Sequence, residues 1–313
     1  MSKRDYSCYD FDKFDYNKKY NLYVDMDTCI FSAAASCAKQ PCQVTHKKTG
    51  RTKTFENFDA FQNFLDHDDK GKNFTINDFE VPILYFAYGN INAKVDAILD
   101  REWIDKVSYY VGGVDNFRKQ LDENYKGNRA AKPLLHKYCY SYAVKKYKPI
   151  VCHGYEAEDH CLADALADEN GVISCVDKDL FNQSAFFLNY GYLDMGVFWI
   201  SPEQAFYNLC IQLMIGDRGT DNIKGIDFVS PELKEKYKVS TKSIGEGTAK
   251  KLLEDVKESI PEMKNRLVDV YKLSYGDGWK EALDFTGKLI YITPKRNKIF
   301  DVNEFLVDDN NYE

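Results

Sequence analysis

The chain of 313 residues contains no long apolar run. A helix needs roughly 20 consecutive apolar residues to cross a bilayer. The polar start MSKRDYSCYDFDKFDY also lacks the apolar segment of a secretory signal. We therefore expect a cytoplasmic protein that does not bind a membrane. Because 44% of the residues are hydrophobic, the chain can still form one large globular domain or two smaller ones.

The nine cysteines include no Cys-x-x-Cys pair. The closest two, Cys37 and Cys42, have no histidine or cysteine partner at the spacing of a zinc site. The others are scattered through apolar segments, which is typical of buried, reduced thiols.

The chain also has no surplus of positive charge, because its 42 Lys and Arg residues are outnumbered by 49 Asp and Glu, which gives a net charge of −7. Nucleic-acid-binding proteins are usually basic. Basic strips nevertheless recur at residues 46–53, 137–148 and 242–251. An acidic pocket flanked by basic strips would produce this net charge. For each strip, the alternative is an ordinary solvated surface.

Strand and helix patterns alternate over the first 200 residues. The run NLYVD (21–25) has the pattern of a buried strand, and a helix is expected directly after it. This order predicts an α/β fold with a mostly parallel central sheet flanked by helices. Further strands are expected at 107–113, 149–153 and 172–176, an edge hairpin at 185–200, and helices at 28–38, 91–103, 133–147 and 156–170.

We divide the chain into an α/β part, residues 1–200, and a helical part, residues 201–313. Residues 39–82 are an expected insertion, with a hairpin around the Thr-Gly turn of THKKTGRTKTF and a short helix in FENFDAFQNFLD.

Acidic residues follow three of the expected strands, at Asp25, Glu156 and Asp177. The carboxyl ends of parallel strands meet at one edge of a sheet, so these carboxylates are expected to converge. Two Mg²⁺ ions held by carboxylates can bind the attacking and leaving oxygens of a phosphodiester. Two alternatives are dispersed surface acids and, at residues 156–159, stabilisation of a helix N-terminus.

Two basic segments supply phosphate-binding groups. YKGNR (125–129) places a lysine and an arginine in a turn, and such cations can bind a phosphate next to a metal site. IGEGTAKKLL (244–253) opens a basic helix with a Gly-x-Gly turn, whose backbone N–H groups can contact a DNA backbone. An ordinary basic turn and an ordinary tight turn are the alternatives.

A series of short motifs in this chain resembles the 5′-nuclease superfamily. In chain order, the motifs are VD, NFR, YKGNR, GYEAED, VDKD, GDRGTDNIKGI and IGEGTAKKLL. This group includes flap endonucleases, bacteriophage 5′→3′ exonucleases and the 5′-nuclease domain of bacterial DNA polymerase I. The resemblance covers residues 20–30 and 113–260. It implies a PIN-like sheet, a helix–hairpin–helix DNA-binding element at 208–256, and Mg²⁺-dependent hydrolysis of DNA near 5′ ends.

The resemblance also implies site residues and partners. Lys126 and Arg129 are the expected phosphate-binding residues. The expected ligands of two Mg²⁺ ions, for which Mn²⁺ can substitute, are Asp25, Glu156, Glu158, Asp159, Asp177, Asp179, Asp217 and Asp221. The expected DNA-binding residues, in a segment that in this family often holds K⁺, are Gly245, Gly247, Thr248, Lys250 and Lys251. The expected partner is nicked, flapped or 5′-ended duplex DNA, or an RNA–DNA hybrid, bound by a monomer in phage replication, primer removal or DNA degradation.

The sequence departs from the family in several places. The usual acid after the second strand is missing, and Asp115 is the nearest carboxylate. Residues 227–243 lengthen the hairpin and are expected to form a loop. The arch at 124–148 is short, which favours exonucleolytic cleavage. The alternatives are a haloacid-dehalogenase-like phosphatase, suggested by YVDMDTCIF, and a non-catalytic structure-specific DNA-binding protein.

Overall fold

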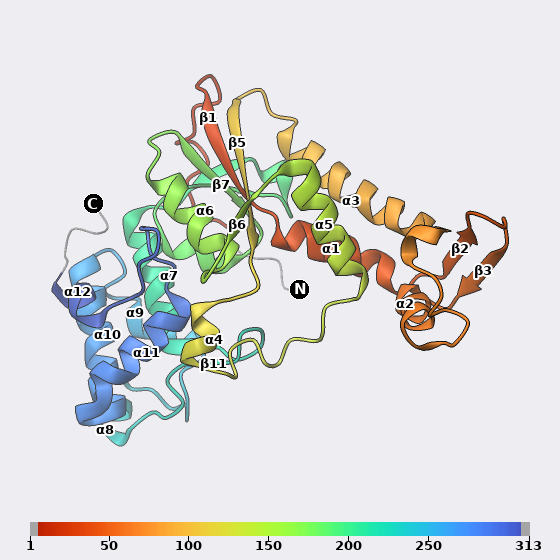
Figure 1. The fold of residues 1–313 in the computed structure, drawn as a ribbon. Coiled ribbons are helices and arrows are strands. Elements are labelled where there is room, and N and C mark those ends of the chain that lie inside the picture. The colour runs from red at the N-terminus through yellow and green to blue at the C-terminus, as the bar shows by residue number, and fades with distance from the viewer. Residues whose placement is uncertain (1–5, 308–313) are drawn as a thin grey trace.

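A computed structural model describes residues 6–307, and its central element is a six-stranded sheet with the order β6-β5-β1-β7-β8-β9 (Figure 1). Neighbouring strands pair in parallel except β8 and β9, which are antiparallel and form the expected edge hairpin. The mostly parallel sheet predicted from the sequence is therefore confirmed. The strands are β1 (Tyr20–Asp25), β5 (Ile104–Gly112), β6 (Ile150–Cys152), β7 (Gly171–Cys175), β8 (Phe186–Asn189) and β9 (Val197–Trp199).

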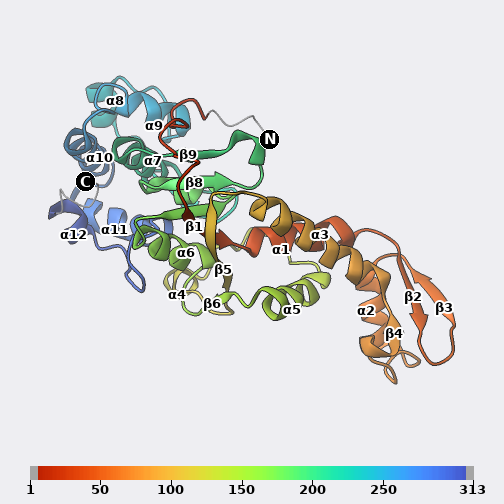
Figure 2. The ribbon, with the colours of Figure 1, turned by 90° about the horizontal axis from the view of Figure 1, so that it is seen from above.

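Helices cover both faces of this sheet because successive side chains of a strand point to opposite faces. Leu22 and Val24 of β1 face a core shared with α1 (Asp27–Ala38), α3 (Pro82–Leu99) and α5 (Leu135–Tyr147). Between them, Tyr23 packs on the opposite core, which contains α6 (Ala157–Leu166). In Figure 2, α1, α3 and α5 lie on one side of the strands and α6 on the other.

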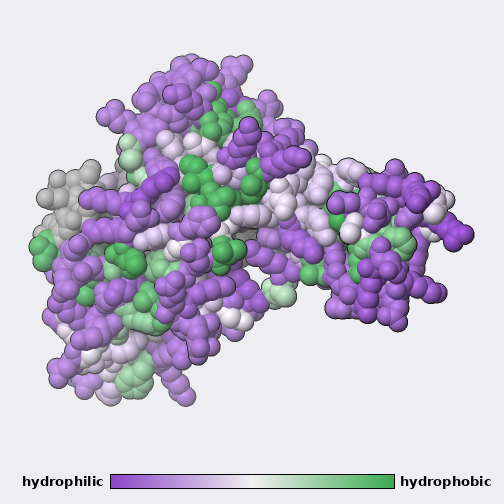
Figure 3. All heavy atoms as spheres, viewed as in Figure 1, coloured by the Kyte–Doolittle hydropathy of each residue, from purple (hydrophilic) through white to green (hydrophobic). Residues whose placement is uncertain are grey.

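Residues between α1 and α3 form a small lobe that projects from the rest of the molecule (Figure 1). The expected hairpin is present, as are a third strand and the expected helix. A hollow separates the lobe from the main body, and the visible surface of both is mostly hydrophilic (Figure 3). The elements of the lobe are β2 (Cys42–His46), β3 (Thr52–Phe55), α2 (Phe58–His67), η1 (Ile76–Asp78) and β4 (Phe79–Glu80).

The C-terminal part is helical, as expected, and has its own core of apolar side chains. It lies on the side of the sheet opposite to α1, α3 and α5 (Figure 2). Its elements are α7 (Pro202–Ile215), β10 (Gly216–Asp217), β11 (Ile223–Lys224), α8 (Pro231–Tyr237), α9 (Glu246–Leu253), α10 (Ile260–Tyr275), η4 (Gly276–Gly278), α11 (Trp279–Ile290) and α12 (Val302–Val307). Short helices in the α/β part are α4 (Phe117–Leu121), η2 (Lys178–Asn182) and η3 (Leu193–Met195).

Two expectations about local structure were wrong. The helix expected at 91–103 is α3, which begins at Pro82, since proline suits the first turn of a helix, and ends at Leu99. The loop expected at 227–243 contains α8, whose first turn is capped by the Ser230 hydroxyl, an acceptor for the Leu233 N–H. Among residues 6–307, no helix combines the length and apolar character needed to cross a membrane.

Candidate active site

Acidic residues identified in the sequence follow the carboxyl ends of three parallel strands of the central sheet. Asp25 is the last residue of β1, and Asp177 follows β7, which pairs with β1. Glu156 lies just before α6, four residues beyond the end of β6. The parallel sheet therefore brings these segments to the same edge, as expected.

Glu156 is fixed in place by a reciprocal cap at the start of α6. The Asp159 side chain accepts a hydrogen bond from the Glu156 backbone N–H at 2.9 Å, and the Glu156 side chain accepts one from the backbone of Asp159. The acids of GYEAED thus also stabilise a helix N-terminus, which was the alternative suggested by their position in the sequence.

Arg118 ties α4 to this helix through a bidentate ion pair. Its Nη1 and Nη2 donate to the two Asp159 carboxylate oxygens at 2.7 and 2.8 Å, and its Nε donates to the Leu289 carbonyl at 3.1 Å. The Arg118 side chain is buried. Because Arg118 binds both oxygens of Asp159, this carboxylate holds the arginine and α6 together, which favours a supporting role for it.

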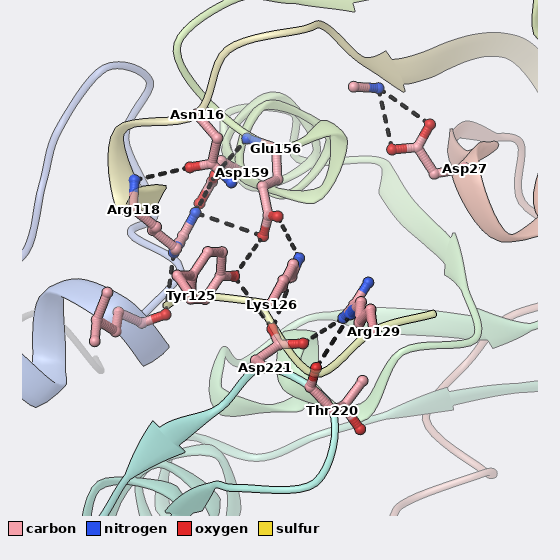
Figure 4. Close-up of polar contacts among 12 residues, drawn as sticks. Asp27, Asn116, Arg118, Tyr125, Lys126, Arg129, Glu156, Asp159, Thr220 and Asp221 are labelled. Carbon is pink, nitrogen blue, oxygen red and sulfur yellow. Dashed lines mark hydrogen bonds and ion pairs between the residues drawn. The ribbon is translucent and has the colours of Figure 1, made fainter. Parts of the chain in front are cut away.

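The turn at residues 125–129 lies against two carboxylates, Glu156 and Asp221 (Figure 4). Lys126 Nζ forms ion pairs with both, and Arg129 forms one with Asp221. The Tyr125 hydroxyl is shared between them, at 3.0 Å from Glu156 Oε2 and 3.1 Å from Asp221 Oδ2. These contacts join residues far apart in the sequence into one polar cluster.

The backbone of Lys126 takes part in this cluster. Its φ of 59° lies in the left-handed region, which residues other than glycine rarely adopt. Its N–H donates to the Asp221 carbonyl at 2.8 Å, and this bond holds the unusual conformation. Such backbone conformations cluster at functional sites.

A second group of acids lines a cavity of about 20 Å³ next to this cluster. Its wall includes the side chains of Glu158, Asp179, Asp217 and Asp221. The tight β10–β11 hairpin carries Asp217 and depends on Gly216, whose φ is 69° and where a Cβ would lie 2.4 Å from Ile223 O. The four expected metal ligands that line this cavity therefore come from three separate segments.

Burial and crowding raise the pKa values of some acids of the site, whereas nearby cations lower that of another. Burial, together with repulsion from neighbouring carboxylates, raises the pKa of Asp25 to about 8 and that of Asp179 to about 7, and places the pKa of Glu158 well above its usual range. Burial also opposes ionisation of Glu156, but Lys126 and Arg118 outweigh it and lower the pKa to about 2. Crowded carboxylates with raised pKa values are those that a nearby cation would stabilise in the ionised form.

The donor chemistry therefore suits a hard divalent cation, because carboxylate oxygens are the ligands that Mg²⁺ prefers. Within residues 6–307, however, no three Asp, Glu, His or Cys side chains converge tightly enough to form a ready-made metal site. The acids form an open group, with Lys126 and Arg129 neutralising part of their charge.

Two acids near the strand ends are bound elsewhere. Asp115 is half exposed and lies 3.6 Å from His153, so the structure places it outside the cluster. Asp27 accepts the Gly112 N–H with both oxygens at 3.1 Å, and Figure 4 draws it apart from Glu156 and Lys126. Glycine at position 112 leaves room for this carboxylate, since a Cβ there would lie 2.8 Å from Asp27 Oδ2.

The Gly-x-Gly segment lies where it was expected, at the start of α9, with Gly245 as the N-cap. Glu246 in the first turn forms an ion pair with Lys250 at 2.8 Å. The hydrogen bond and charge of Lys250 lower the pKa of Glu246, and Lys178 of the cavity wall adds to this effect. The start of α9 is therefore within electrostatic reach of the acidic cavity. The remaining residues assigned to DNA binding, Gly247, Thr248 and Lys251, lie in the same helix.

No protein-family model matches the chain, and no curated protein sequence does. Solved structures similar to it include the catalytic core of Rad2 in complex with DNA substrate, with 11% identity and a TM-score of 0.44, covering 91% of this chain and 81% of that chain. Another is the bacteriophage T5 D15 flap endonuclease in complex with DNA and metal ions, with 12% identity and a TM-score of 0.38, covering 87% of this chain and 98% of that chain.

Three residues of the site were not singled out from the sequence. Tyr125 and Arg118 lie within the YKGNR and NFR motifs, which the sequence did indicate. The residues that they contact could not be read from these motifs. Gln212, on α7, donates to Asp179 Oδ1 at 3.2 Å. Its only signal is a polar residue in the apolar run CIQLMI, five positions before Asp217.

Proposed function

We propose that the protein is a divalent-metal-dependent nuclease that hydrolyses DNA phosphodiesters near 5′ ends. The observation that carries this proposal is the placement of two cations, Lys126 and Arg129, in contact with the carboxylates Glu156 and Asp221, next to an acid-lined cavity. A phosphodiester-cleaving site needs positive groups for the phosphate and carboxylates for the metal in one place.

In this proposal, Mg²⁺ held by the carboxylates would supply an activated water and withdraw charge from the phosphate. Lys126 and Arg129 orient the scissile phosphate and neutralise its developing charge. Water attacks phosphorus and the bond to the 3′ oxygen breaks, which leaves a 3′-hydroxyl on one product and a 5′-phosphate on the other. Arg118 and Tyr125 hold Glu156 in position, and Asp159 anchors Arg118.

The proposed Mg²⁺ ligands are Asp25, Glu156 and Glu158 for one ion and Asp177, Asp179 and Asp217 for the other, with Asp221 in a supporting position. Mn²⁺ is the proposed substitute. The start of α9 is the proposed contact with the DNA backbone, together with K⁺, because helix N–H groups and the helix dipole favour phosphate there. We further propose that the protein acts as a monomer. Its proposed substrates are nicked, flapped or 5′-ended DNA and the RNA of RNA–DNA hybrids.

The test is digestion of 5′-labelled duplex, nicked, flapped and RNA–DNA hybrid substrates with Mg²⁺ and with EDTA. We expect Mg²⁺-dependent cleavage, and product sizes distinguish mononucleotide release from flap removal. Lys126→Ala should slow cleavage by roughly 10²–10³-fold, the usual effect of losing one group that stabilises transition-state charge. Lys119→Ala, at an exposed lysine of α4, is the matched control and should leave the rate unchanged.

Four outcomes would contradict the proposal. Full activity in EDTA, or in Lys126→Ala, would exclude the mechanism. DNA binding without cleavage in either Mg²⁺ or Mn²⁺ would identify a non-catalytic binding protein. Hydrolysis of p-nitrophenyl phosphate with no action on DNA would instead support a phosphatase.

A further inference from the structure

We infer that Gln212 is a positioning residue for Asp179: its side-chain amide fixes the carboxylate that faces the acidic cavity, and so sets the affinity of this site for a divalent cation. This inference rests on the proposed function, because it concerns the metal that the cavity acids would hold.

Gln212 and Asp179 meet across the boundary between the two parts of the chain. Gln212 lies on α7, and Asp179 lies in η2, directly after β7. Gln212 Nε2 donates to Asp179 Oδ1 at 3.2 Å, and no hydrogen bond or ion pair within residues 6–307 reaches Asp179 Oδ2. Both side chains line the cavity. One oxygen of Asp179 is thus held by the protein while the other stays available.

A neighbouring amide contacts the other end of the Gln212 side chain. Asn182 Nδ2 donates to Gln212 Oε1 at 3.1 Å. Asn182 is fully buried and lies in the same short helix as Asp179. In this arrangement the Gln212 carbonyl oxygen accepts from Asn182, and its N–H group faces Asp179. The pair therefore acts as a fixed donor toward the carboxylate.

Such a donor suits the position of Asp179 among like charges. Asp177, Asp217 and Asp221 repel a negative charge on Asp179, whereas the adjacent Lys178 attracts it. A neutral N–H opposes this repulsion without adding a cation that would compete with a metal ion. Hydrogen bonds to ligating carboxylates typically change metal affinity by 10–100-fold when they are removed.

The test compares Mn²⁺ binding by the full-length wild-type protein and Gln212→Met, measured without DNA from the free-Mn²⁺ electron paramagnetic resonance signal. Methionine has a similar length but no N–H donor. We expect a dissociation constant for Mn²⁺ that is roughly tenfold or more higher in Q212M. The Mg²⁺ concentration for half-maximal DNA cleavage should rise by a similar factor, and excess Mg²⁺ should restore most of the maximal rate.

Gln204→Met is the matched control. Gln204 is also half-buried on α7 and donates to Asn208 Oδ1 at 2.9 Å, but it does not line the cavity. Q204M should bind Mn²⁺ like the wild type. If Q212M does not fold, Gln212→Asn keeps the amide on a side chain one methylene shorter and must show the same loss of affinity.

The outcomes separate this inference from the proposed function. Wild-type affinity in a folded Q212M or Q212N, with DNA cleavage intact, would overturn the role of Gln212 and leave the nuclease proposal standing. A lower melting temperature without any change in Mn²⁺ affinity would reduce Gln212 to a structural residue. A wild-type protein that binds no Mn²⁺ would overturn both.

Discussion

Arg118 is the most deeply buried charged side chain of residues 6–307, with 1% of its surface exposed. Its guanidinium connects α4, α6 and the end of α11 through Asp159 and the Leu289 carbonyl. A buried cation with every contact made by the protein is costly to lose, because its partners stay behind as uncompensated groups. At the residue scale, this ion pair supports the shape of the site, whereas Lys126 is the residue proposed to contact the phosphate.

Replacing Arg118 with methionine should therefore destabilise the protein. Asp159 would keep a buried charge without its partner, and breaking a buried ion pair in this way typically costs about 3–5 kcal/mol. Urea unfolding followed by circular dichroism measures the change. Arg51→Met, at an exposed arginine, is the control. A loss below about 1 kcal/mol in Arg118→Met would show that the pair contributes little.

The raised pKa values of Asp25 and Asp179 predict a pH-dependent stability in EDTA. Both pKa values, about 8 and about 7, lie above the 3.8 of an unfolded aspartate, so the folded state binds more protons between these limits. The metal-free protein should therefore lose stability as the pH rises from 4 to 8. The lowered pKa of Glu156, about 2, acts in the opposite sense and only below pH 4.5.

Melting temperatures in EDTA across this pH range check the prediction. Adding Mg²⁺ or Mn²⁺ should raise the melting temperature more at pH 8 than at pH 5, because a cation stabilises the ionised carboxylates. Asp179→Asn removes one of the two groups and should flatten the decline. A melting temperature that rises steadily from pH 5 to pH 8 in EDTA would contradict the assignment.

At the element scale, the start of α9 combines favourable and unfavourable features for a DNA phosphate. The helix N-terminus favours an anion, whereas Glu246 in the first turn repels one. Lys251 adds a positive charge in the last turn of this short helix. A Cβ at Gly245 or Gly247 would meet nothing within 4 Å, so neither glycine is required by packing. Open space at both glycines is what a closely approaching backbone would need.

Glu246→Gln should accordingly tighten DNA binding by roughly two- to fivefold, the range expected for a charge near a helix N-terminus. Lys251→Ala should weaken DNA binding, because it removes a positive charge that can pair with a phosphate. Fluorescence anisotropy with a labelled nicked duplex in EDTA measures both without cleavage. Glu262→Gln, in the first turn of α10, is the matched control for the loss of one acid. Unchanged affinity in both α9 variants would place DNA elsewhere on the molecule.

The sequence predicted whole elements better than contacts. The strand at NLYVD and the helix at α9 carry their periodicity and end signals locally, so both were placed correctly. The helix α8 was missed because its short run PELKEKY lacks a clear apolar period. Likewise, Lys126 and Arg129 stand out as a basic turn, but their pairing with Asp221 spans more than 90 residues and depends on tertiary structure.

At the scale of the whole molecule, the α/β part and the helical part are connected through several buried contacts. Gln183 donates to the Ile292 carbonyl at 2.9 Å, Arg118 donates to that of Leu289, and α7 packs on η2. The candidate site draws residues from both parts, since Asp217, Asp221 and Gln212 lie beyond residue 200. Neither part alone contains the full set of acids.

The α/β part and the helical part should therefore unfold in a single transition. Trp103 and Trp199 report on the α/β part and Trp279 on the helical part, so fluorescence of single-tryptophan variants follows each part separately. We expect urea midpoints that agree with each other and with far-ultraviolet circular dichroism. Two separated midpoints would show that the parts unfold independently.

The turn at 125–129 is held to the acids of the site by ion pairs as well as by the Tyr125 hydroxyl. A divalent cation that binds Glu156 or Asp221 competes with Lys126 and Arg129 for the same carboxylates. By thermodynamic reciprocity, a bound cation must weaken the ion pairs of the turn, and these ion pairs must weaken binding of the cation. The turn should become more accessible to trypsin, which cuts after lysine and arginine, when metal is bound, so proteolysis reports on the cation without any nucleic acid present.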